Sequence, residues 1–276
     1  MKTQAEKAQA FRALHQRDAA FIIPNPWDVG TARLLANLGF EALASTSAGY
    51  AFSMGLADYK VGRDRMLAHV TELVAATDLP VSADLENGFG DKLEDVAQTY
   101  RLAAAAGLAG ASIEDATGRS DHPIYEHALA VERVSAAVEA VRALPFPFTL
   151  TARAENYLHG RPDLKDTIKR LQAYQDAGAD VLYAPGLRTK ADIAAVVTSV
   201  DLPVNVLMGG AGIPLSAAEL SDIGVKRISV GSALNRAALG AFLRASREML
   251  EHGTFTFGEE AVSYQDITEL LKATPF

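Results

Sequence analysis

The sequence of 276 residues predicts an α/β protein folded as a (β/α)8 barrel, the architecture called the TIM barrel. Three observations support this prediction. Apolar runs suited to buried parallel strands occur eight times, segments with helical periodicity lie between them, and the connections are short. Such strand–helix units favour parallel pairing with right-handed crossovers. An open, doubly wound sheet is the competing architecture, and eight units favour the closed barrel.

The predicted strands lie at residues 20–24, 42–46, 80–86, 110–115, 146–153, 181–185, 203–208 and 227–231. The predicted helices lie at residues 28–38, 60–77, 91–106, 128–143, 163–177, 189–199, 216–223 and 233–252. Several of these helices end at a glycine that directly precedes the next strand, as in AGLAGASI and AGADVLY. Glycine has no Cβ and adopts the left-handed conformation of a helix stop at low cost.

Two more segments lie outside the repeated units. Residues 3–17 predict an N-terminal amphipathic helix with Ala8, Phe11 and Leu14 on one face. Residues 253–276 form a C-terminal helical extension that either caps the barrel or packs on another subunit. No linker divides the chain, so we expect residues 1–276 to form a single barrel domain that carries this extension.

The composition excludes several classes of function. The formal net charge is −8 and no basic run occurs, so we expect neither nucleic-acid nor membrane partners. The absence of cysteine excludes disulfides, a thiolate nucleophile and cysteine-based metal sites. The N-terminus lacks the apolar segment of a signal peptide, and no apolar run is long enough to span a membrane. We therefore expect a cytoplasmic protein.

Two carboxylates stand at the end of the third predicted strand, in the stretch PVSADLENGFG at residues 80–90. Asp84 and Glu86 are two residues apart, so on a strand their side chains would point to the same face. Like charges this close are tolerated most readily with a cation between them, and Mg²⁺ takes one or two protein carboxylates and keeps several waters. The alternative is a pair of solvated surface acids.

More charged residues end the next two predicted strands. Glu114 and Asp115 end the fourth strand, and Arg153 ends the fifth. Catalytic groups of a barrel gather where its strands end, so four acids are expected to converge on one mouth. This convergence is costly without a cation, which favours a metal site over surface acids. Arg153 either binds a substrate carboxylate in a bidentate manner or neutralises the acids.

Other strand ends supply candidate substrate-binding residues. Thr46, Ser47 and Ala48 follow the second predicted strand, and small residues there let backbone N–H groups approach an anion. A plain tight turn is the alternative. Asn205 lies in the seventh predicted strand.

The polar connection at residues 116–127 has the length of an active-site lid. It carries His122, and a histidine can donate or accept a proton near neutral pH. An exposed histidine without a function is the alternative reading of this residue.

Five stretches together resemble the isocitrate lyase and phosphoenolpyruvate mutase superfamily. They are NPWDVGTARLLANLGFEALASTSAG, GLAD at residues 55–58, SADLENGFG, GASIED and TARAEN. The resemblance extends over about residues 20 to 235. Members of this superfamily are Mg²⁺-dependent (β/α)8 barrels that cleave or form C–C or C–P bonds next to a carboxylate. Their final helix is typically swapped between the subunits of a tetramer, so the resemblance implies a homo-oligomer, either a tetramer or a dimer.

The resemblance assigns metal-binding roles to three acids of this sequence. Asp84 and Glu86 match two aspartates that bind Mg²⁺ directly or through water. Glu86 departs from that pattern in length, though not in charge. Glu114 matches an acid that surrounds the metal ligands. Mg²⁺ is therefore the cofactor that the resemblance implies.

The resemblance also assigns substrate-binding and catalytic roles. Asp58 matches an active-site aspartate that follows the second strand. Thr46, Ser47 and Ala48 match small residues whose backbone holds the substrate carboxylate. Arg153 matches an arginine beside the substrate.

The loop after the fourth predicted strand departs from the superfamily pattern. Lyase members carry a Lys-Arg-Cys-Gly-His stretch there, and its cysteine supplies a proton to the product. This chain reads ATGRSDHPIY and has no cysteine, and the lysine and asparagine of mutase loops are also missing. From their position on the loop, His122, Arg119 or Tyr125 are candidates to replace the missing acid.

These observations predict a Mg²⁺-dependent lyase or decarboxylase that acts on a C–C bond of a small 2-oxo or 2-hydroxy carboxylate or dicarboxylate. A 2-oxo acid chelates Mg²⁺ through its carboxylate and carbonyl oxygens, so the metal would stabilise the enolate that develops. Two alternatives stay open at this stage. One is a C–P hydrolase or mutase of the phosphonopyruvate type, and the other is a 2-oxo-acid binding protein without turnover.

Overall fold

A computed structural model describes residues 2–210 and 214–272 of the chain. Its strands are β1 (Phe21–Ile23), β2 (Leu43–Ala44), β3 (Val81–Asp84), β4 (Gly110–Glu114), β5 (Thr149–Arg153), β6 (Val181–Tyr183), β7 (Val204–Leu207) and β8 (Arg227–Ser229). All pair in parallel, in the order β1-β8-β7-β6-β5-β4-β3-β2. The Ala44 N–H donates to the Pro24 carbonyl oxygen at 3.1 Å, next to the two outer strands. The sheet therefore forms a nearly closed barrel, which confirms the (β/α)8 prediction over the open sheet.

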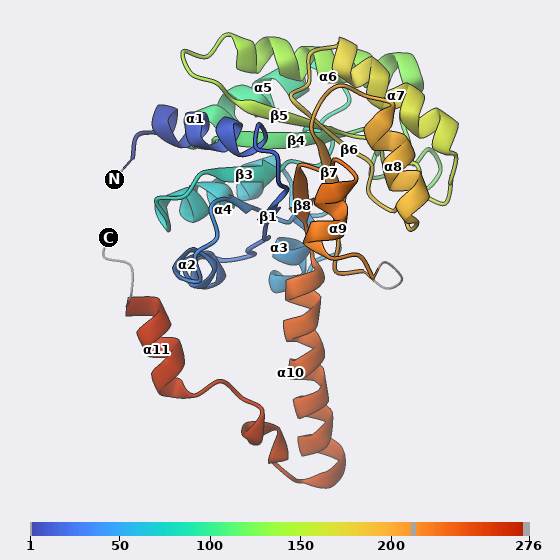
Figure 1. Ribbon diagram of the computed structural model, residues 1–276. Helices are drawn as coiled ribbons and strands as arrows, with labels where there is room; N and C mark the ends of the chain where they lie inside the picture. Colours follow the sequence, from blue (N-terminus) through green and yellow to red (C-terminus); the bar gives the residue numbers. More distant parts are fainter. Residues whose placement is uncertain (1, 211–213, 273–276) are drawn as a thin grey trace.

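Helices follow the strands, and all but the last of them surround the barrel (Figure 1). They are α2 (Val29–Asn37), α4 (Arg63–Ala75), α5 (Leu93–Ala105), α6 (His127–Arg142), α7 (Leu164–Asp176), α8 (Lys190–Thr198), α9 (Ala217–Asp222) and α10 (Ala233–His252). Their predicted positions are confirmed apart from small shifts at the ends. A further helix, α3 (Ser47–Ser53), was not predicted. The Thr46 side chain caps it by accepting a hydrogen bond from the Gly49 N–H at 3.2 Å.

The N-terminal helix, α1 (Gln4–Leu14), covers the amino ends of the strands. Its buried face includes Phe11, which packs in one apolar cluster with Phe21 and Ala109. The approach is close at Gly110, because a Cβ there would lie 2.9 Å from a Phe11 ring carbon and 2.5 Å from the Thr149 carbonyl oxygen. A glycine at the start of β4 is therefore what allows α1 to pack against the barrel.

His15 makes this end of the barrel sensitive to acid. Its Nδ1 lies 2.9 Å from the Phe11 carbonyl oxygen, and its Nε2 is buried without a partner in the described part of the chain. Burial, with the charge of Arg227, lowers the pKa of His15 to about 3. Since the unfolded histidine binds a proton near pH 6.5 and the folded one does not, stability is full above that pH and falls as the pH drops below it.

We expect the wild type to lose about 2 kcal/mol of unfolding free energy between pH 8 and pH 5 through His15 alone. The measurement is urea unfolding across this range for the wild type and for His15→Phe, in which this contribution should vanish. His252→Gln, which alters an exposed histidine of α10, should keep the wild-type slope. Equal slopes for the wild type and His15→Phe would contradict the assignment.

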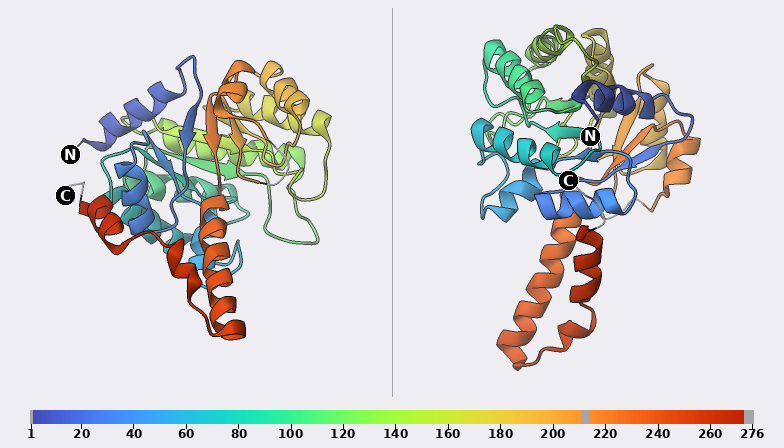
Figure 2. Two further views of the ribbon diagram at one scale, coloured as in Figure 1. Left: turned by 60° about the horizontal axis from the view of Figure 1, so that its bottom comes forward. Right: turned by 90° about the vertical axis from the view of Figure 1, so that its left-hand side faces the viewer.

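The C-terminal segment leaves the body of the barrel. Helix α10 extends away from it, and after the short helix η1 (Thr256–Glu259) the chain returns as α11 (Tyr264–Lys272), which contacts α2 (Figures 1 and 2). Asn235 is the buried residue of α10, and Phe242 and Leu250 are largely exposed. The single-domain organisation and the exchange of the final helix between subunits stay predictions.

Among the described residues, none of the helices combines the length and the apolar character that a membrane span requires.

Candidate active site

A cavity of about 310 Å³ opens at the carboxyl ends of the strands, where barrel enzymes hold their active sites. The predicted site residues that line it are Thr46, Ser47, Ala48, Asp58, Asp84, Glu114 and Arg153. Residues from β2 to β5 and from the connections after them therefore meet at one place. Glu86, His122 and Asn205, which were also predicted, are not among the lining residues.

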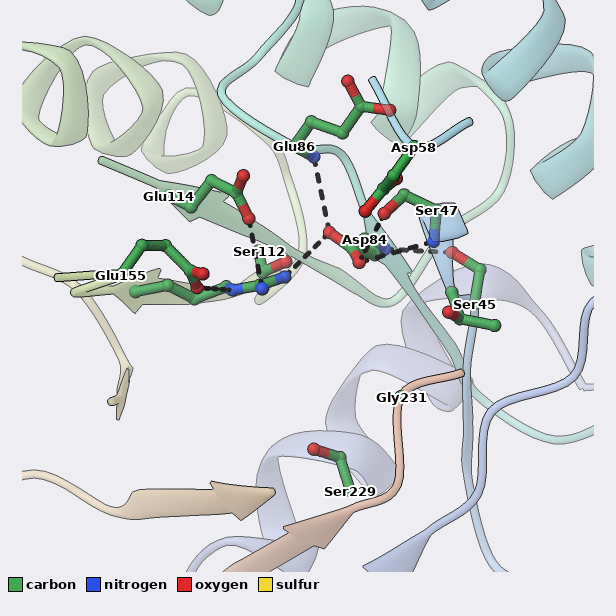
Figure 3. A network of polar contacts seen from close by, with 12 residues as sticks. Ser45, Ser47, Asp58, Asp84, Glu86, Ser112, Glu114, Glu155, Ser229 and Gly231 are labelled. Carbon is green, nitrogen blue, oxygen red and sulfur yellow. Dashed lines mark hydrogen bonds and ion pairs between the residues drawn. The ribbon is translucent and has the colours of Figure 1, made fainter. Parts of the chain in front are cut away.

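Arg153 is the centre of the charged groups in the cavity. Its guanidinium lies 2.9 Å from an Asp84 oxygen, 3.1 Å from a Glu114 oxygen and 2.8 Å from a Glu155 oxygen (Figure 3). Burial opposes its charge, but these three carboxylates raise the pKa of Arg153 above its usual range. Of the two sequence-based readings of Arg153, the structure shows the one in which it neutralises the acids. Glu155 had no predicted role, although it follows Arg153 by only two residues.

The orientation of Asp84 is determined by residues next to it as well as by Arg153. The Ser47 hydroxyl donates to Asp84 Oδ2 at 3.1 Å, and the Asp84 N–H donates to the Ser45 hydroxyl oxygen at 2.9 Å. Ser47 is the first residue of α3, so this short helix helps to fix the position of the Asp84 carboxylate. Both carboxylate oxygens of Asp84 are thereby presented at the cavity wall.

Glu86 lies differently from its prediction. Strand β3 ends at Asp84, and Glu86 has a φ of 49°, in the left-handed region. The strand alternation that would place both side chains on one face therefore stops before Glu86. The Glu86 carboxylate points away from Asp84 (Figure 3). The prediction that the two acids point to the same face is wrong for this reason. A non-glycine residue in this region stores backbone strain, which is frequent at functional sites.

The residues around Asp84 fit a hard cation such as Mg²⁺. The Glu86 Oε1 is buried without a hydrogen-bond partner in the described residues. Burial and the charges of Asp84 and Asp58 raise the pKa of Glu86 to about 8, and burial with the charge of Asp84 also raises that of Asp58. In the described chain, no three acidic or imidazole side chains form a metal-binding cluster by themselves. Mg²⁺ needs only one or two carboxylates and completes its shell with water, so this arrangement suits it.

Tyr59 is a cavity residue without a predicted function. Its hydroxyl donates to the Glu114 carboxylate, and its φ of 62° is again left-handed. Its ring lies against Gly118, where a Cβ would be only 3.0 Å from a Tyr59 ring carbon. The signal in the sequence was an aromatic residue directly after Asp58, at the mouth of the barrel.

Asn205 does not contact the cavity, in contrast to its prediction. Its Nδ2 donates to the Ser229 hydroxyl oxygen at 2.9 Å, and its Oδ1 accepts from Arg227 Nε at 2.8 Å. Both polar atoms of the amide therefore bond to side chains of β8, so Asn205 holds Arg227 and Ser229 in position. Arg227 lines the cavity instead. The signal for Arg227 was the alternation RISVG, which places Arg227 and Ser229 on one face of the strand.

Comparisons with known proteins agree with this geometry. The sequence profile of the family described as Phosphoenolpyruvate phosphomutase matches residues 11–250. The chain belongs to this family. It is an enzyme of the isocitrate lyase and phosphoenolpyruvate mutase superfamily, whose members include carbon–carbon lyases. The resemblance found in the sequence is thereby confirmed.

Three similar proteins illustrate the range of this family. A crystal structure of a "putative lyase/mutase" from Burkholderia cenocepacia J2315 has 66% identity and a TM-score of 0.95, and the match covers 98% of this chain and 97% of the other. A 2-methylisocitrate lyase from Halalkalibacterium halodurans is 27% identical over 98% of this chain and 94% of its own. An oxaloacetate decarboxylase from Pseudomonas savastanoi pv. phaseolicola is 28% identical over 88% and 85%, respectively.

The loop at residues 116–127, for which the sequence predicted a lid, is bound by an ion pair and a hydrogen bond to the turn after β3. Arg119 pairs with Asp91 at 2.7 Å, and the Tyr125 hydroxyl donates to the other oxygen of Asp91 at 2.5 Å. His122 is exposed. None of these three loop residues lines the cavity, so the structure does not bring the predicted replacements for the cysteine to the site.

Arg133 of α6 holds the turn between β3 and α5 in this family member. It is buried, it donates to the carbonyl oxygens of Asn87, Gly90 and Asp91, and its guanidinium lies 4.2 Å from the centre of the Tyr125 ring. Arg133→Met would leave these carbonyl groups unpaired, and each unpaired buried group costs roughly 1–3 kcal/mol. We therefore expect the unfolding free energy, measured with urea, to fall by about 3 kcal/mol.

The matched control is Arg142→Met on the same helix. Arg142 is half exposed and pairs with Asp180 at 2.8 Å, so its loss should cost less than about 1 kcal/mol. A loss for Arg133→Met no larger than that of the control would contradict the role of Arg133.

Proposed function

We propose that this protein is a Mg²⁺-dependent lyase or decarboxylase that acts on a C–C bond of a small 2-oxo or 2-hydroxy carboxylate or dicarboxylate. The observation that carries the proposal is the cavity in which Arg153 joins Asp84 and Glu114, beside the unpartnered Glu86 oxygen. The names of the relatives support it, since 2-methylisocitrate and oxaloacetate are both small carboxylates.

Asp84 would hold Mg²⁺ directly or through water, with Asp58 as the second acid on the cavity wall. Glu86, whose carboxylate points away from Asp84, would take part through bound water. When bound, Mg²⁺ supplies Lewis-acid charge where electron density builds up on the substrate oxygens.

The protein's own groups bind and orient the substrate. Arg153 adds a positive charge that three carboxylates hold in place, on a side chain that is only 13% exposed, where charge stabilisation is stronger than in bulk water. Thr46, Ser47 and Ala48 form the wall beside Asp84 and limit the orientations of a substrate carboxylate. The Tyr59 hydroxyl proton is held by Glu114 at the cavity mouth.

The test is a panel of 2-oxo and 2-hydroxy acids that includes oxaloacetate and 2-methylisocitrate, incubated with Mg²⁺ and read by mass spectrometry of the products. We expect cleavage of at least one acid, and its loss when EDTA removes the metal. Tight binding of a keto acid without any product would contradict the lyase proposal and support the binding-protein alternative.

Cleavage of a C–P bond is the second candidate, and the description of the matched family favours it. Release of inorganic phosphate from phosphonopyruvate, with no cleavage of the carbon acids, would decide for this candidate. Phosphate release is measured in the same incubations, so one experiment compares the two.

We also propose that the protein is a cytoplasmic homo-oligomer, a dimer or a tetramer, in which a second copy covers α10. Phe242 and Leu250 of this helix are 65% and 86% exposed, which is costly for large apolar side chains in a monomer. Light scattering should give a multiple of the chain mass of 29.3 kDa, and Phe242→Glu should reduce it. A monomeric wild type would contradict this proposal.

A further inference from the structure

The active-site cavity has a polar floor inside the barrel. Ser82, Ser112 and Ser229 line it below the carboxylates around Arg153, together with Arg227. The interior of such barrels is usually filled by Val, Ile and Leu. Serine side chains are small, so here the cavity continues downwards to the Arg227 guanidinium.

Arg227 is a buried cation without a carboxylate partner in the described residues. It is 4% exposed, its Nε donates to Asn205 at 2.8 Å, and its Nη1 donates to the Thr151 hydroxyl oxygen at 3.0 Å. Both partners are neutral. A buried guanidinium that pairs only with neutral groups is costly, because a charge loses its hydration on burial.

The two arginines of the cavity differ in their charge balance. Arg153 contacts three carboxylates, whereas Arg227 contacts none. Burial and the charge of Arg153 together lower the pKa of Arg227 to about 10, so Arg227 stays charged at neutral pH. The mouth of the cavity is therefore acidic and suits a metal, while its floor is positive.

We propose that Arg227 binds a second carboxylate of the substrate and so makes the site selective for small dicarboxylates. Asn205 and Thr151 hold Nε and Nη1 in place, and Nη2 makes no hydrogen bond to a described residue. A planar guanidinium held in this way matches the geometry of a carboxylate. The assignment rests on the proposed function in one respect: that function places the other carboxylate of the substrate near Thr46, Asp58 and Asp84.

The test compares two ligands that differ by one carboxylate. (S)-Malate is (S)-lactate with a carboxylate on its methyl carbon, and both are measured by calorimetry in the presence of Mg²⁺. We expect the wild type to bind malate about tenfold more tightly than lactate, or better. Arg227→Met should bring malate binding down to the level of lactate and leave lactate unchanged. Lys226→Met is the control, because it also removes one positive charge and should keep the malate preference. The Lys226 ammonium donates to the backbone carbonyls of Arg17 and Asp18.

Three results would overturn the assignment. The malate preference could survive in Arg227→Met, or the folded variant could lose affinity for malate and lactate equally. The third result is a wild type that shows no malate preference. Circular dichroism establishes that the variant is folded. If it is not, a crystal structure of the wild type with Mg²⁺ and malate decides. A malate carboxylate within hydrogen-bond distance of Arg227 supports the proposal, and malate bound wholly above that residue overturns it.

Turnover plays no part in these measurements. Absence of lyase activity would refute the proposed function and leave the malate preference intact. Absence of the malate preference in the wild type, or its survival in Arg227→Met, would refute the role of Arg227 and leave the lyase reaction open.

Discussion

Asp84→Asn is expected to lower kcat/KM by about 10²–10³-fold, because it removes the charge that would hold Mg²⁺ next to the substrate. The amide keeps the size of the side chain and can still accept from Ser47, so the wall of the cavity should persist. The measurement is kcat/KM as a function of Mg²⁺ concentration on the acid that the panel identifies. The variant should need far more Mg²⁺ than the wild type or fail to respond to it.

The same substitution weakens the contact of Asp84 with Arg153 at 2.9 Å, but Arg153 keeps Glu114 and Glu155 as partners, so we expect a stability close to that of the wild type. Asp84 raises the pKa values of Glu86 and Asp58 through like-charge repulsion, and removal of its charge relieves that repulsion. Sites that are strained for function commonly gain stability when they lose activity. Asp78→Asn, at a half-exposed acid just before β3, is the control and should alter neither property. Wild-type activity and Mg²⁺ dependence in Asp84→Asn would refute the metal site.

Arg153→Met is expected to abolish measurable activity and also to destabilise the fold. It leaves Asp84, Glu114 and Glu155 without their cation, and loss of one partner of a buried ion pair costs roughly 3–5 kcal/mol. Activity should fall by about 10³-fold or more, since both the charge and the positions of the acids are lost. Urea unfolding and kcat/KM measure the two effects.

The destabilisation should depend on pH in a defined direction. Burial already raises the pKa of Glu155 to about 7 in the wild type, and without Arg153 it should rise further. A carboxyl group whose pKa is higher in the folded than in the unfolded state contributes stability at low pH and loses it as the pH rises through the folded pKa. The deficit of Arg153→Met relative to the wild type should therefore be smaller at pH 5.5 than at pH 8.

Arg153→Lys serves as the matched variant. It retains one positive charge but cannot pair with three carboxylates at once, so its stability should lie between those of the wild type and Arg153→Met. A pH-independent deficit in Arg153→Met, or one equal to that of Arg153→Lys, would contradict the account of the three carboxylates.

Most of the fold could be predicted from local patterns. The strands are short and mostly buried, and most of the helices between them have an apolar face and a clear stop, so periodicity and turn residues locate both. Helix α3 was not predicted because its seven residues, SAGYAFS, are too few to show helical periodicity. The helix begins at the Thr46 cap, which consists of one hydrogen bond, and a plain turn can contain the same hydrogen bond.

The site could be predicted in part. The acids and Arg153 at the strand ends were identified because parallel strands in a barrel bring their carboxyl ends to one rim, so position along the chain implies position in space. Glu86 and Asn205 were placed incorrectly for local reasons. A left-handed residue ends the alternation at Glu86, and a neighbouring arginine occupies the amide of Asn205.

The sequence by itself determined the barrel, the rim on which the site lies, and the family. These depend on the periodicity of buried residues and on ordered motifs, both of which are properties of the chain read in order. Only the tertiary structure decided that Arg153 joins three carboxylates, that Tyr59 contacts Glu114, and that Arg227 forms the floor of the cavity. Those contacts join residues far apart in the chain, and the pairing of charges depends on distances of a few ångströms across the barrel.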